Sequence, residues 1–209
     1  GQVLGLTAAQ ALKARLDAAG ITLRTAPDLL DAIWPDRPAL PAQQVYAHRA
    51  PHAPRTRAAK LALVREAMAR QGATQHFVST VDDIAWLTNL RGSDVEYNPV
   101  FLAHLLLGLS GGRLFVGEGK VDATLRDELA ADGIAVVPYG QAAAALAALG
   151  ADDVLLIDPK RITLGFREQV GHGCRVVEAI NPTTLLKSRK TEAEAAFIRQ
   201  AMAEDGAAM

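Results

Sequence analysis

The chain has 209 residues, of which 50% are hydrophobic, and a formal net charge of -1. This length allows one large or two small globular domains, and the balanced charge excludes an extended field that would attract nucleic acid or an anionic membrane. The single cysteine, Cys174, excludes an intrachain disulfide, and the longest apolar stretch, 100–109, is too short to span a bilayer. We therefore expect a cytoplasmic protein with no nucleic-acid or membrane partner.

Residues 1–54 are predicted to form the end of an α/β unit followed by a linker. Apolar residues at helical spacing predict a helix over 8–19 that ends at Gly20, and the residues 21–23 predict a strand. The prolines in 35–54 disfavour both a helix and an internal strand, which is typical of a linker. Because this α/β unit is too small to stand alone, we interpret it as the C-terminal remnant of a first domain.

Residues 55–188 are predicted to form a second α/β unit. An amphipathic helix is expected from Ala58 to Arg70, and buried strands are expected at 76–79 and 100–109. A Ser-Gly-Gly turn then predicts a hairpin whose second strand is 113–116. The fold class that follows is α/β, with a mixed β-sheet flanked by helices.

Helices and strands alternate through the rest of this unit, with glycine or proline at most junctions. The predicted helices are 123–131 and 141–149, and the predicted strands are 134–137, 154–157 and 176–177. Residues 189–209 open with a Thr-Glu-x-Glu pattern, which predicts a capped helix. We interpret this helix as the beginning of a third, truncated unit, because its apolar stripe has no visible partner.

Two groups of possible metal ligands have ordinary structural explanations. His48 and His52 are four residues apart, but Pro51 between them prevents the helix that would place both imidazoles on one face. His172 and Cys174 lack a second Cys/His pair, so a turn before a strand is the favoured interpretation. No metal site is predicted in this chain.

The sequence contains no complete catalytic constellation. His104 alternates with leucines on a predicted strand face, where a lone histidine is typically a hydrogen-bonded core residue. Four carboxylates on the last helix spread over different faces, which favours capping and solvation: Glu192, Glu194, Glu204 and Asp205. No catalytic residue is therefore assigned.

The segment 91–99 admits two interpretations. Its arginine, two acids, tyrosine and asparagine lie in a predicted loop between two regular elements, where binding groups are usually presented. Alternatively, Arg91 and Asp94 pair with each other while Gly92 and Pro99 shape the turn. The residue chemistry alone leaves both interpretations open.

The same segment carries a resemblance to a known family. Residues 83–101 read Asp-Ile-Ala-Trp-Leu-Thr-Asn-Leu-Arg-Gly-Ser-Asp-Val-Glu-Tyr-Asn-Pro-Val-Phe, and they are similar to the middle domain of three-domain Xaa-Pro aminopeptidases. The stretch 34–38 resembles the Trp-x-Asp-Arg-Pro segment that closes the family's first domain. The stretch 186–194 resembles the approach to the family's catalytic domain. The resemblance covers most of the chain from about Asp28 onward.

This resemblance implies a creatinase N-terminal-like fold, repeated twice, ahead of a pita-bread metallopeptidase domain that removes the N-terminal residue preceding proline. On this interpretation 1–54 is the first-domain remnant and linker, 55–188 the middle domain and 189–209 the first catalytic-domain helix. Two divalent metal ions, usually manganese, are held in the missing domain by two aspartates, one histidine and two glutamates. The chain alone is expected to be inactive and to contain neither metal ligands nor cofactors.

The resemblance also implies a role for the loop and a set of partners. The residues expected to form a substrate-access loop are Arg91, Asp94, Glu96, Tyr97, Asn98 and Phe101. Arg91 either binds a peptide carbonyl or carboxylate or locks the loop through Asp94 and Glu96. Tyr97 and Phe101 are expected to offer apolar walls, and Trp86 to pack in the core beneath the loop.

The implied partners are a peptide with proline in second position, the catalytic domain of the same protein and a second copy in a homodimer. A free-standing creatinase-like module that binds a peptide or protein partner, without peptidase activity, is the alternative function.

Overall fold

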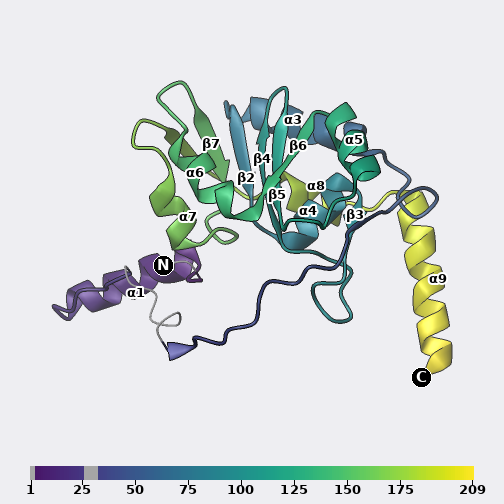
Figure 1. Cartoon of the computed structure of the whole chain (residues 1–209), viewed down its shortest axis with the longest axis horizontal. Helices are drawn as coiled ribbons and strands as arrows, with labels where there is room; N and C mark the ends of the chain where they lie inside the picture. The colour runs from purple at the N-terminus through teal and green to yellow at the C-terminus, as the bar shows by residue number, and fades with distance from the viewer. Residues whose placement is uncertain (1–2, 26–32) are drawn as a thin grey trace.

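The computed structural model describes residues 3–25 and 33–209. At its centre lies a six-stranded sheet of strand order β6-β5-β4-β2-β7-β8 (Figure 1). The β2–β4 and β4–β5 pairs are antiparallel, whereas β2–β7, β7–β8 and β5–β6 are parallel. The predicted mixed sheet is therefore confirmed. Its strands are β2 (Gln75–Val78), β4 (Ala103–Gly108), β5 (Gly112–Val116), β6 (Ile134–Pro138), β7 (Val154–Ile157) and β8 (Arg175–Glu178).

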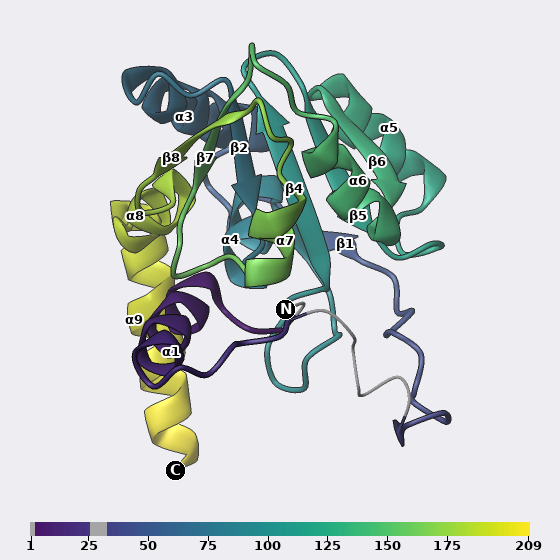
Figure 2. The same cartoon turned by 90° about the vertical axis from the view of Figure 1, so that its left-hand side faces the viewer.

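Helices cover both faces of this sheet. In Figure 1, α3, α4 and α8 lie behind the strands and α6 and α7 lie in front of them, and Figure 2 shows the same arrangement from the side. The helices are α1 (Leu6–Ala18), α3 (Arg57–Arg70), α4 (Val81–Thr88), α5 (Ala123–Ala131), α6 (Ala142–Ala147), α7 (Leu164–Gln169), α8 (Pro182–Ser188) and α9 (Glu192–Ala208), with a 3-10 turn η1 (Tyr139–Gln141). Helices α7 and α8 are not predicted from the sequence.

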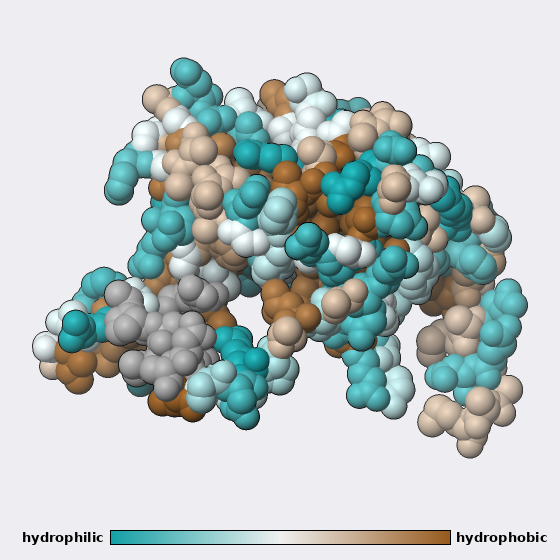
Figure 3. Space-filling model, viewed as in Figure 1, coloured by the Kyte–Doolittle hydropathy of each residue, from teal (hydrophilic) through white to brown (hydrophobic). Residues whose placement is uncertain are grey.

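The core has two parts, one on each side of the sheet. Because successive side chains of a strand point to opposite faces, Leu105 and Leu107 of β4 join the part covered by α3, α4 and α5, whereas Leu106 joins the part covered by α6 and α7. On the face shown in Figure 3, the strongly hydrophobic residues gather at the centre of the sheet domain, between α6 and α5. The apolar runs of the sequence thus become a sheet that is covered on both sides.

Helix α3 illustrates how the local pattern determines an element. Its apolar positions Leu61, Val64 and Met68 lie on one face and are fully buried. The Thr56 side chain accepts a hydrogen bond from the Ala59 amide at the N-terminus, and Gly72 adopts a positive φ of 65° just after the C-terminus. The predicted helix is confirmed.

Two predictions for the N-terminal segment are wrong. Residues 21–23 form no strand, because they follow α1 as extended, mostly exposed chain without a pairing partner among the strands described. Within the predicted linker, β1 (Tyr46–Ala47) pairs antiparallel with β3 (Leu90–Arg91). Residues 42–50 contain no proline, so their backbone amides are free to pair where the fold brings β3 beside them.

The first helix begins against the sheet domain. The Leu6 amide donates to the Ile162 carbonyl at 2.9 Å, and the Leu6 side chain is buried with the part of the core beneath α6 and α7. The predicted helix over 8–19 is confirmed, although most of its remaining apolar residues are exposed. The boundaries at 54 and 188 that divide the chain into three units stay a prediction.

The last helix, α9, is confirmed with its cap. The Thr191 hydroxyl accepts from the Glu194 amide while the Glu194 carboxylate accepts from the Thr191 amide, which forms a capping box. The helix projects away from the sheet domain (Figure 1), and the apolar side chains of Ile198 and Met202 are exposed. Near its start, the Phe197 ring lies 4.9 Å from the His52 ring, centroid to centroid. No helix in the described part of the chain is both long and apolar enough to cross a membrane.

Two buried histidines lie in the strands. Burial lowers the pKa of His104 to about 4, and its Nδ1 lies 3.0 Å from the Ser79 hydroxyl, so the predicted hydrogen-bonded core role is confirmed. Burial likewise lowers the pKa of His76 to about 4, although the Leu156 carbonyl and the charges of Asp83 and Asp158 act in the opposite direction. Both imidazoles are therefore neutral near pH 7 in the folded protein.

These histidines predict a loss of stability on mild acidification. Because their folded pKa lies below the unfolded value near 6.5, the unfolded chain binds more protons as the pH falls from about 6.5 to 4. We expect the unfolding free energy to decrease over this window by up to ~1.4 kcal/mol per pH unit for each histidine. Urea titrations at pH 7, 6 and 5 measure this slope. His104→Gln should reduce the slope by about one proton, and an unaltered slope in this variant would contradict this account.

Candidate functional site

The loop between β3 and β4 doubles back on itself. The Gly92 amide donates to the Pro99 carbonyl at 3.4 Å, and the Asp94 amide donates to the Val100 carbonyl at 3.2 Å. At the far end the Asn98 amide donates to the Val95 carbonyl at 3.1 Å. These bonds divide the loop into two parts. The base comprises residues 92–94 and 99–102, next to β3 and β4, and the tip comprises residues 95–98.

The tip is fully presented to solvent. Glu96, Tyr97 and Asn98 are exposed, and Tyr97 retains 98% of its accessible surface. Tyr97 also has a φ of 59°, in the left-handed region that non-glycine residues enter only at a cost of about 1–2 kcal/mol. In Figures 1 and 2 the loop projects from the same side of the sheet domain as α9. The tip is therefore available to a neighbouring group on that side.

The base of the loop is held by a buried acid. One Asp94 carboxylate oxygen lies 2.5 Å from Lys120 Nζ, and the other accepts a hydrogen bond from the Leu102 amide at 2.7 Å. Asp94 therefore pairs with Lys120, and the proposed pairing of Arg91 with Asp94 is wrong. The carboxylate faces the interior of the loop and not the solvent.

Arg91 holds the base in another way. Its Nη1 donates to the carbonyls of Ala85 and Leu90, each at 2.9 Å, and burial lowers the pKa of the guanidinium. Arg91 therefore holds the loop through hydrogen bonds to backbone carbonyls, and not through Asp94 as expected. Because the residue is only partly buried, its position at the foot of the loop remains open on one side.

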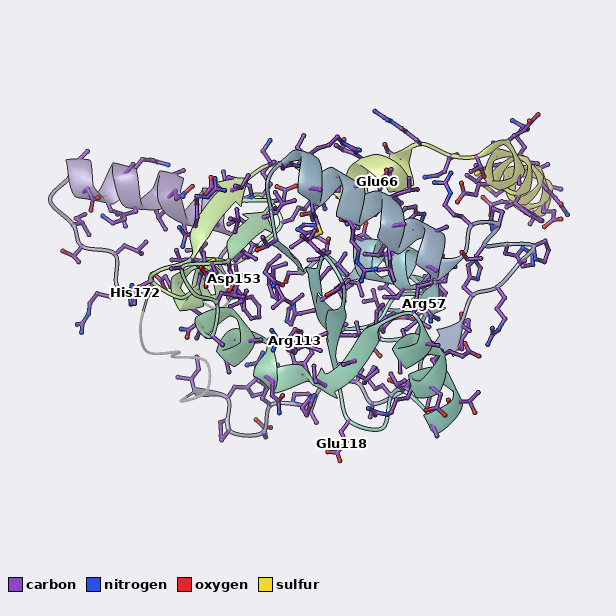
Figure 4. The ribbon with its side chains drawn as sticks, turned by 90° about the horizontal axis from the view of Figure 1, so that it is seen from above. Arg57, Glu66, Arg113, Glu118, Asp153 and His172 are labelled. Atoms are coloured by element: carbon purple, nitrogen blue, oxygen red, sulfur yellow. The ribbon has the colours of Figure 1, made fainter. Side chains whose placement is uncertain are left out.

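The Ala85 carbonyl that Arg91 contacts belongs to the C-terminal half of α4, where two further cations also bind backbone carbonyls. Arg57 Nε donates to the Thr88 carbonyl at 2.7 Å, and Lys60 Nζ donates to the Trp86 carbonyl at 2.8 Å. Arg57 and Lys60 are three residues apart on α3, so they share one face of that helix, and Figure 4 shows Arg57 at the end of α3 nearest α5. The negative end of the α4 dipole is thereby neutralised.

Lys60 is the most buried of these cations. Its Nζ also donates to Asn89 Oδ1 at 2.6 Å and lies 4.4 Å from the centroid of the Trp86 ring. Burial lowers the pKa of Lys60 to about 8, while the charge of Glu194 raises it and the charge of Arg91 lowers it. Trp86 packs against the core at this position, as predicted. The foot of the loop and the start of α9 therefore share one electrostatic environment.

Phe101 does not form an exposed wall, contrary to the prediction. Its side chain is 0% exposed and belongs to the core. A Cβ added at Gly92 would lie only 2.7 Å from the Phe101 Cβ, so glycine is required for the close approach of the two strands. Phe101 supports the loop from below, and Tyr97 alone provides an exposed aromatic group at the tip.

The other candidate residues have structural roles. His48 and His52 stack in an irregular segment, with ring centroids 6.1 Å apart, and not on a helix. His172 lies in an exposed turn directly before β8, as expected, and Figure 4 shows it on an outer loop. The carboxylates on α9 are also structural, since Glu194 caps the helix and Glu204 accepts from Gln200.

A dinuclear metal centre needs a cluster of His, Asp and Glu side chains. Across residues 3–25 and 33–209, no group of three or more His, Cys, Asp or Glu side chains is placed to hold a metal ion. The residues present therefore do not fit the two metal ions that the resemblance implies.

A cleft of about 540 Å³ lies beside the foot of the loop. Arg49 and Arg57 line it and form ion pairs with Glu128 at 2.7 Å and Asp132 at 2.9 Å. Neither this cleft nor the cations Lys60 and Lys120 are indicated by the sequence pattern. Their residues come from distant segments, and no local spacing connects them.

The sequence matches the family described as the Creatinase/Prolidase N-terminal domain over residues 36–194, more than half of its length. The chain therefore belongs to this family. The structure agrees, because it aligns with a crystal structure described as X-prolyl aminopeptidase from Caenorhabditis elegans, a cytosolic enzyme with a di-nuclear active site. The TM-score is 0.84 over 95% of this chain and 33% of that chain, at 23% identity, which shows a shared fold.

Curated relatives carry related names. The probable Xaa-Pro aminopeptidase P of Arthroderma benhamiae is 33% identical over 192 residues, which are 87% of this chain and 27% of the relative. Aminopeptidase P2 of Arabidopsis thaliana is 36% identical over 151 residues, 70% of this chain and 21% of the relative. A probable Xaa-Pro aminopeptidase P of Coccidioides posadasii is 31% identical over 100% of this chain and 37% of the relative. The chain thus spans between 21% and 37% of the length of these relatives.

The close approach at Gly92 predicts the effect of one added methyl group. Gly92→Ala places a Cβ against Phe101 and the Val100 carbonyl, and such overpacking costs about 1–3 kcal/mol. We expect a lower thermal midpoint and a lower urea midpoint at an unchanged m value. Gly140→Ala is the matched control, because nothing lies within 4 Å of a Cβ at that position. Equal stability of the two variants would show that the strands separate at Gly92 without cost.

Proposed function

We propose that this chain is the N-terminal, non-catalytic portion of an Xaa-Pro aminopeptidase, an enzyme that removes the N-terminal residue preceding proline. The observation that supports this most directly is the identity of 31–33% to proteins named Xaa-Pro aminopeptidase P over 87–100% of this chain. The shared fold with the C. elegans enzyme adds to it. That enzyme is described as cytosolic, which supports a cytoplasmic location here as well.

In this proposal the loop 91–101 limits access to a neighbouring catalytic cleft. Its tip residues Glu96, Tyr97 and Asn98 contact the peptide, because they are exposed and the loop that carries them projects on the same side of the sheet domain as α9 (Figure 1). Arg91, Asp94 and Phe101 give the loop its shape, since their polar or apolar groups are directed to carbonyls, to Lys120 and to the core. The substrate class is a short peptide with proline in second position.

The chemistry itself belongs to another part of the enzyme. A di-nuclear active site is described for the C. elegans protein, and we propose two divalent ions, manganese by the family resemblance, in a catalytic domain that continues beyond α9. No residue of this chain is assigned to those ions. The exposed apolar stripe of α9 would pack against that catalytic domain, and a second copy of the chain would complete a homodimer.

The 209-residue chain alone should not hydrolyse peptides. We expect no release of the first residue from an Xaa-Pro peptide in the presence of Mn²⁺, because no metal-binding cluster exists among the described residues. Liquid chromatography of the products measures this directly, and turnover at the rate of a complete relative would refute the proposal. The reading frame downstream of codon 209 provides the control: we expect it to encode two aspartates, a histidine and two glutamates in a metallopeptidase domain. A frame that ends there would favour the free-standing binding module.

A substitution at the loop tip should alter substrate binding and not the fold. In the full-length enzyme, Tyr97→Ala should raise KM for short Xaa-Pro peptides about fivefold and leave kcat unchanged, because it removes only a contact at the entrance. Steady-state kinetics on tripeptides measure the two constants. Glu118→Ala is the control, since Glu118 is exposed on a different turn and points outward (Figure 4). Unchanged kinetics in Tyr97→Ala would remove the tip from the substrate path.

A further inference from the structure

A fully buried ion pair connects the loop to the turn after β5. The Asp94 side chain is 0% exposed and the Lys120 side chain is 1% exposed, and their charged groups lie 2.5 Å apart. The two residues are 26 positions apart in sequence, and Lys120 lies in the turn between β5 and α5. Gly117 makes room for the lysine, because a Cβ there would lie 2.9 Å from Lys120 Cδ.

The remaining hydrogen bonds of the pair join three segments. Lys120 Nζ also donates to the Pro41 carbonyl at 3.2 Å, and the Lys120 carbonyl accepts from the Val45 amide at 2.8 Å. Across the loop, the second oxygen of Asp94 accepts from the Leu102 amide. One ion pair thus connects the two sides of the loop with the segment 41–45 and with the β5–α5 turn.

The energetics of such a pair favour a geometric role. Removing two charges from water costs nearly as much as their attraction returns, so a buried ion pair contributes little more stability than an apolar pair of the same volume. An apolar pair of the same volume makes no directional hydrogen bonds, so it does not fix the orientation of the two side chains or of the backbone amides bound to them. The loss on replacing both charges should therefore appear in the order of the loop and not in the stability of the domain.

We propose that Asp94 and Lys120 are positioning residues that hold the exposed tip 95–98 in one conformation. Only the consequence for peptide binding rests on the proposed function; the ordering of the loop does not. The ion pair fixes the distance between the two sides of the loop at its base. With that distance fixed, the tip closes through the hydrogen bond from the Asn98 amide to the Val95 carbonyl and through the left-handed backbone conformation of Tyr97.

Hydrogen exchange on the 209-residue chain tests this proposal. In the double variant Asp94→Asn with Lys120→Met, we expect amides of the segment 92–102 to exchange about tenfold faster, while amides of β4 and β5 exchange at the parent rate. The thermal midpoint should stay within about 3 °C of the parent value. The matched control replaces another ion pair, Lys187→Met with Asp83→Asn, and should leave exchange in 92–102 unchanged.

Single variants separate the two effects. Lys120→Met alone leaves the Asp94 charge buried without its cation, so we expect the thermal midpoint to fall by about 10 °C. Asp94→Asn alone keeps an acceptor for the Leu102 amide and the same side-chain size, but it leaves the Lys120 charge buried without its anion, so we expect a lower thermal midpoint together with faster loop exchange in a folded protein. Parent-like exchange in both Asp94→Asn and the double variant would overturn the proposal. A double variant that fails to fold would also overturn it, because the pair would then support the whole domain.

Kinetics separate this inference from the proposed function. In the full-length enzyme the double variant should raise KM for short Xaa-Pro peptides and leave kcat unchanged. Faster loop exchange with unchanged KM would support Asp94 and Lys120 as positioning residues and would contradict the role of the loop in substrate access. A fall in kcat with unchanged loop exchange would overturn the positioning role itself.

Discussion

The arrangement of the site depends on the C-terminal end of α4. Its terminal carbonyls carry the negative end of the helix dipole into a partly buried position, where unpaired acceptors are costly. Arg57, Lys60 and Arg91 satisfy these carbonyls from two different elements, α3 and β3. Because β3 leaves α4 at this point and pairs with β1, the same contacts determine where the loop begins. The position of the candidate site is thus a consequence of how one helix end is capped.

Most of the fold could be predicted from local pattern, and the exceptions have a common physical cause. Elements such as α5 and β7 bury a periodic or continuous apolar set, so the sequence alone reveals their type and nearly their bounds. The two-residue strands β1 and β3 have no such set, since they exist only because each finds the other across 44 residues. The wrongly predicted strand at 21–23 is the converse case, because it pairs with none of the strands that the structure describes. Pairing is a tertiary property, and short strands depend on it entirely.

The contacts of single side chains in the site likewise depend on the tertiary structure and cannot be predicted from the local sequence. The glycine, proline and polar residues of 91–99 correctly indicate a loop, but they do not reveal the partners of its charges. Arg91 and Asp94 are only three residues apart in sequence, yet they contact different groups: Arg91 donates to a carbonyl of α4, and Asp94 pairs with Lys120. Phe101 is misread for a similar reason, since its burial depends on how closely β3 approaches the start of β4. The tip residues 96–98 are exposed, as a polar loop predicts, and their part in substrate access stays a prediction.

Lys60 connects these observations to the rest of the molecule. It is buried over the Trp86 ring and bonded to the α4 terminus, yet its charge is also felt by Glu194 in the capping box of α9. A buried cation is tolerated where carbonyl dipoles and a nearby carboxylate compensate its lost hydration, and both are present here. The capping of α4, the foot of the loop and the first turn of α9 therefore lie in one electrostatic network.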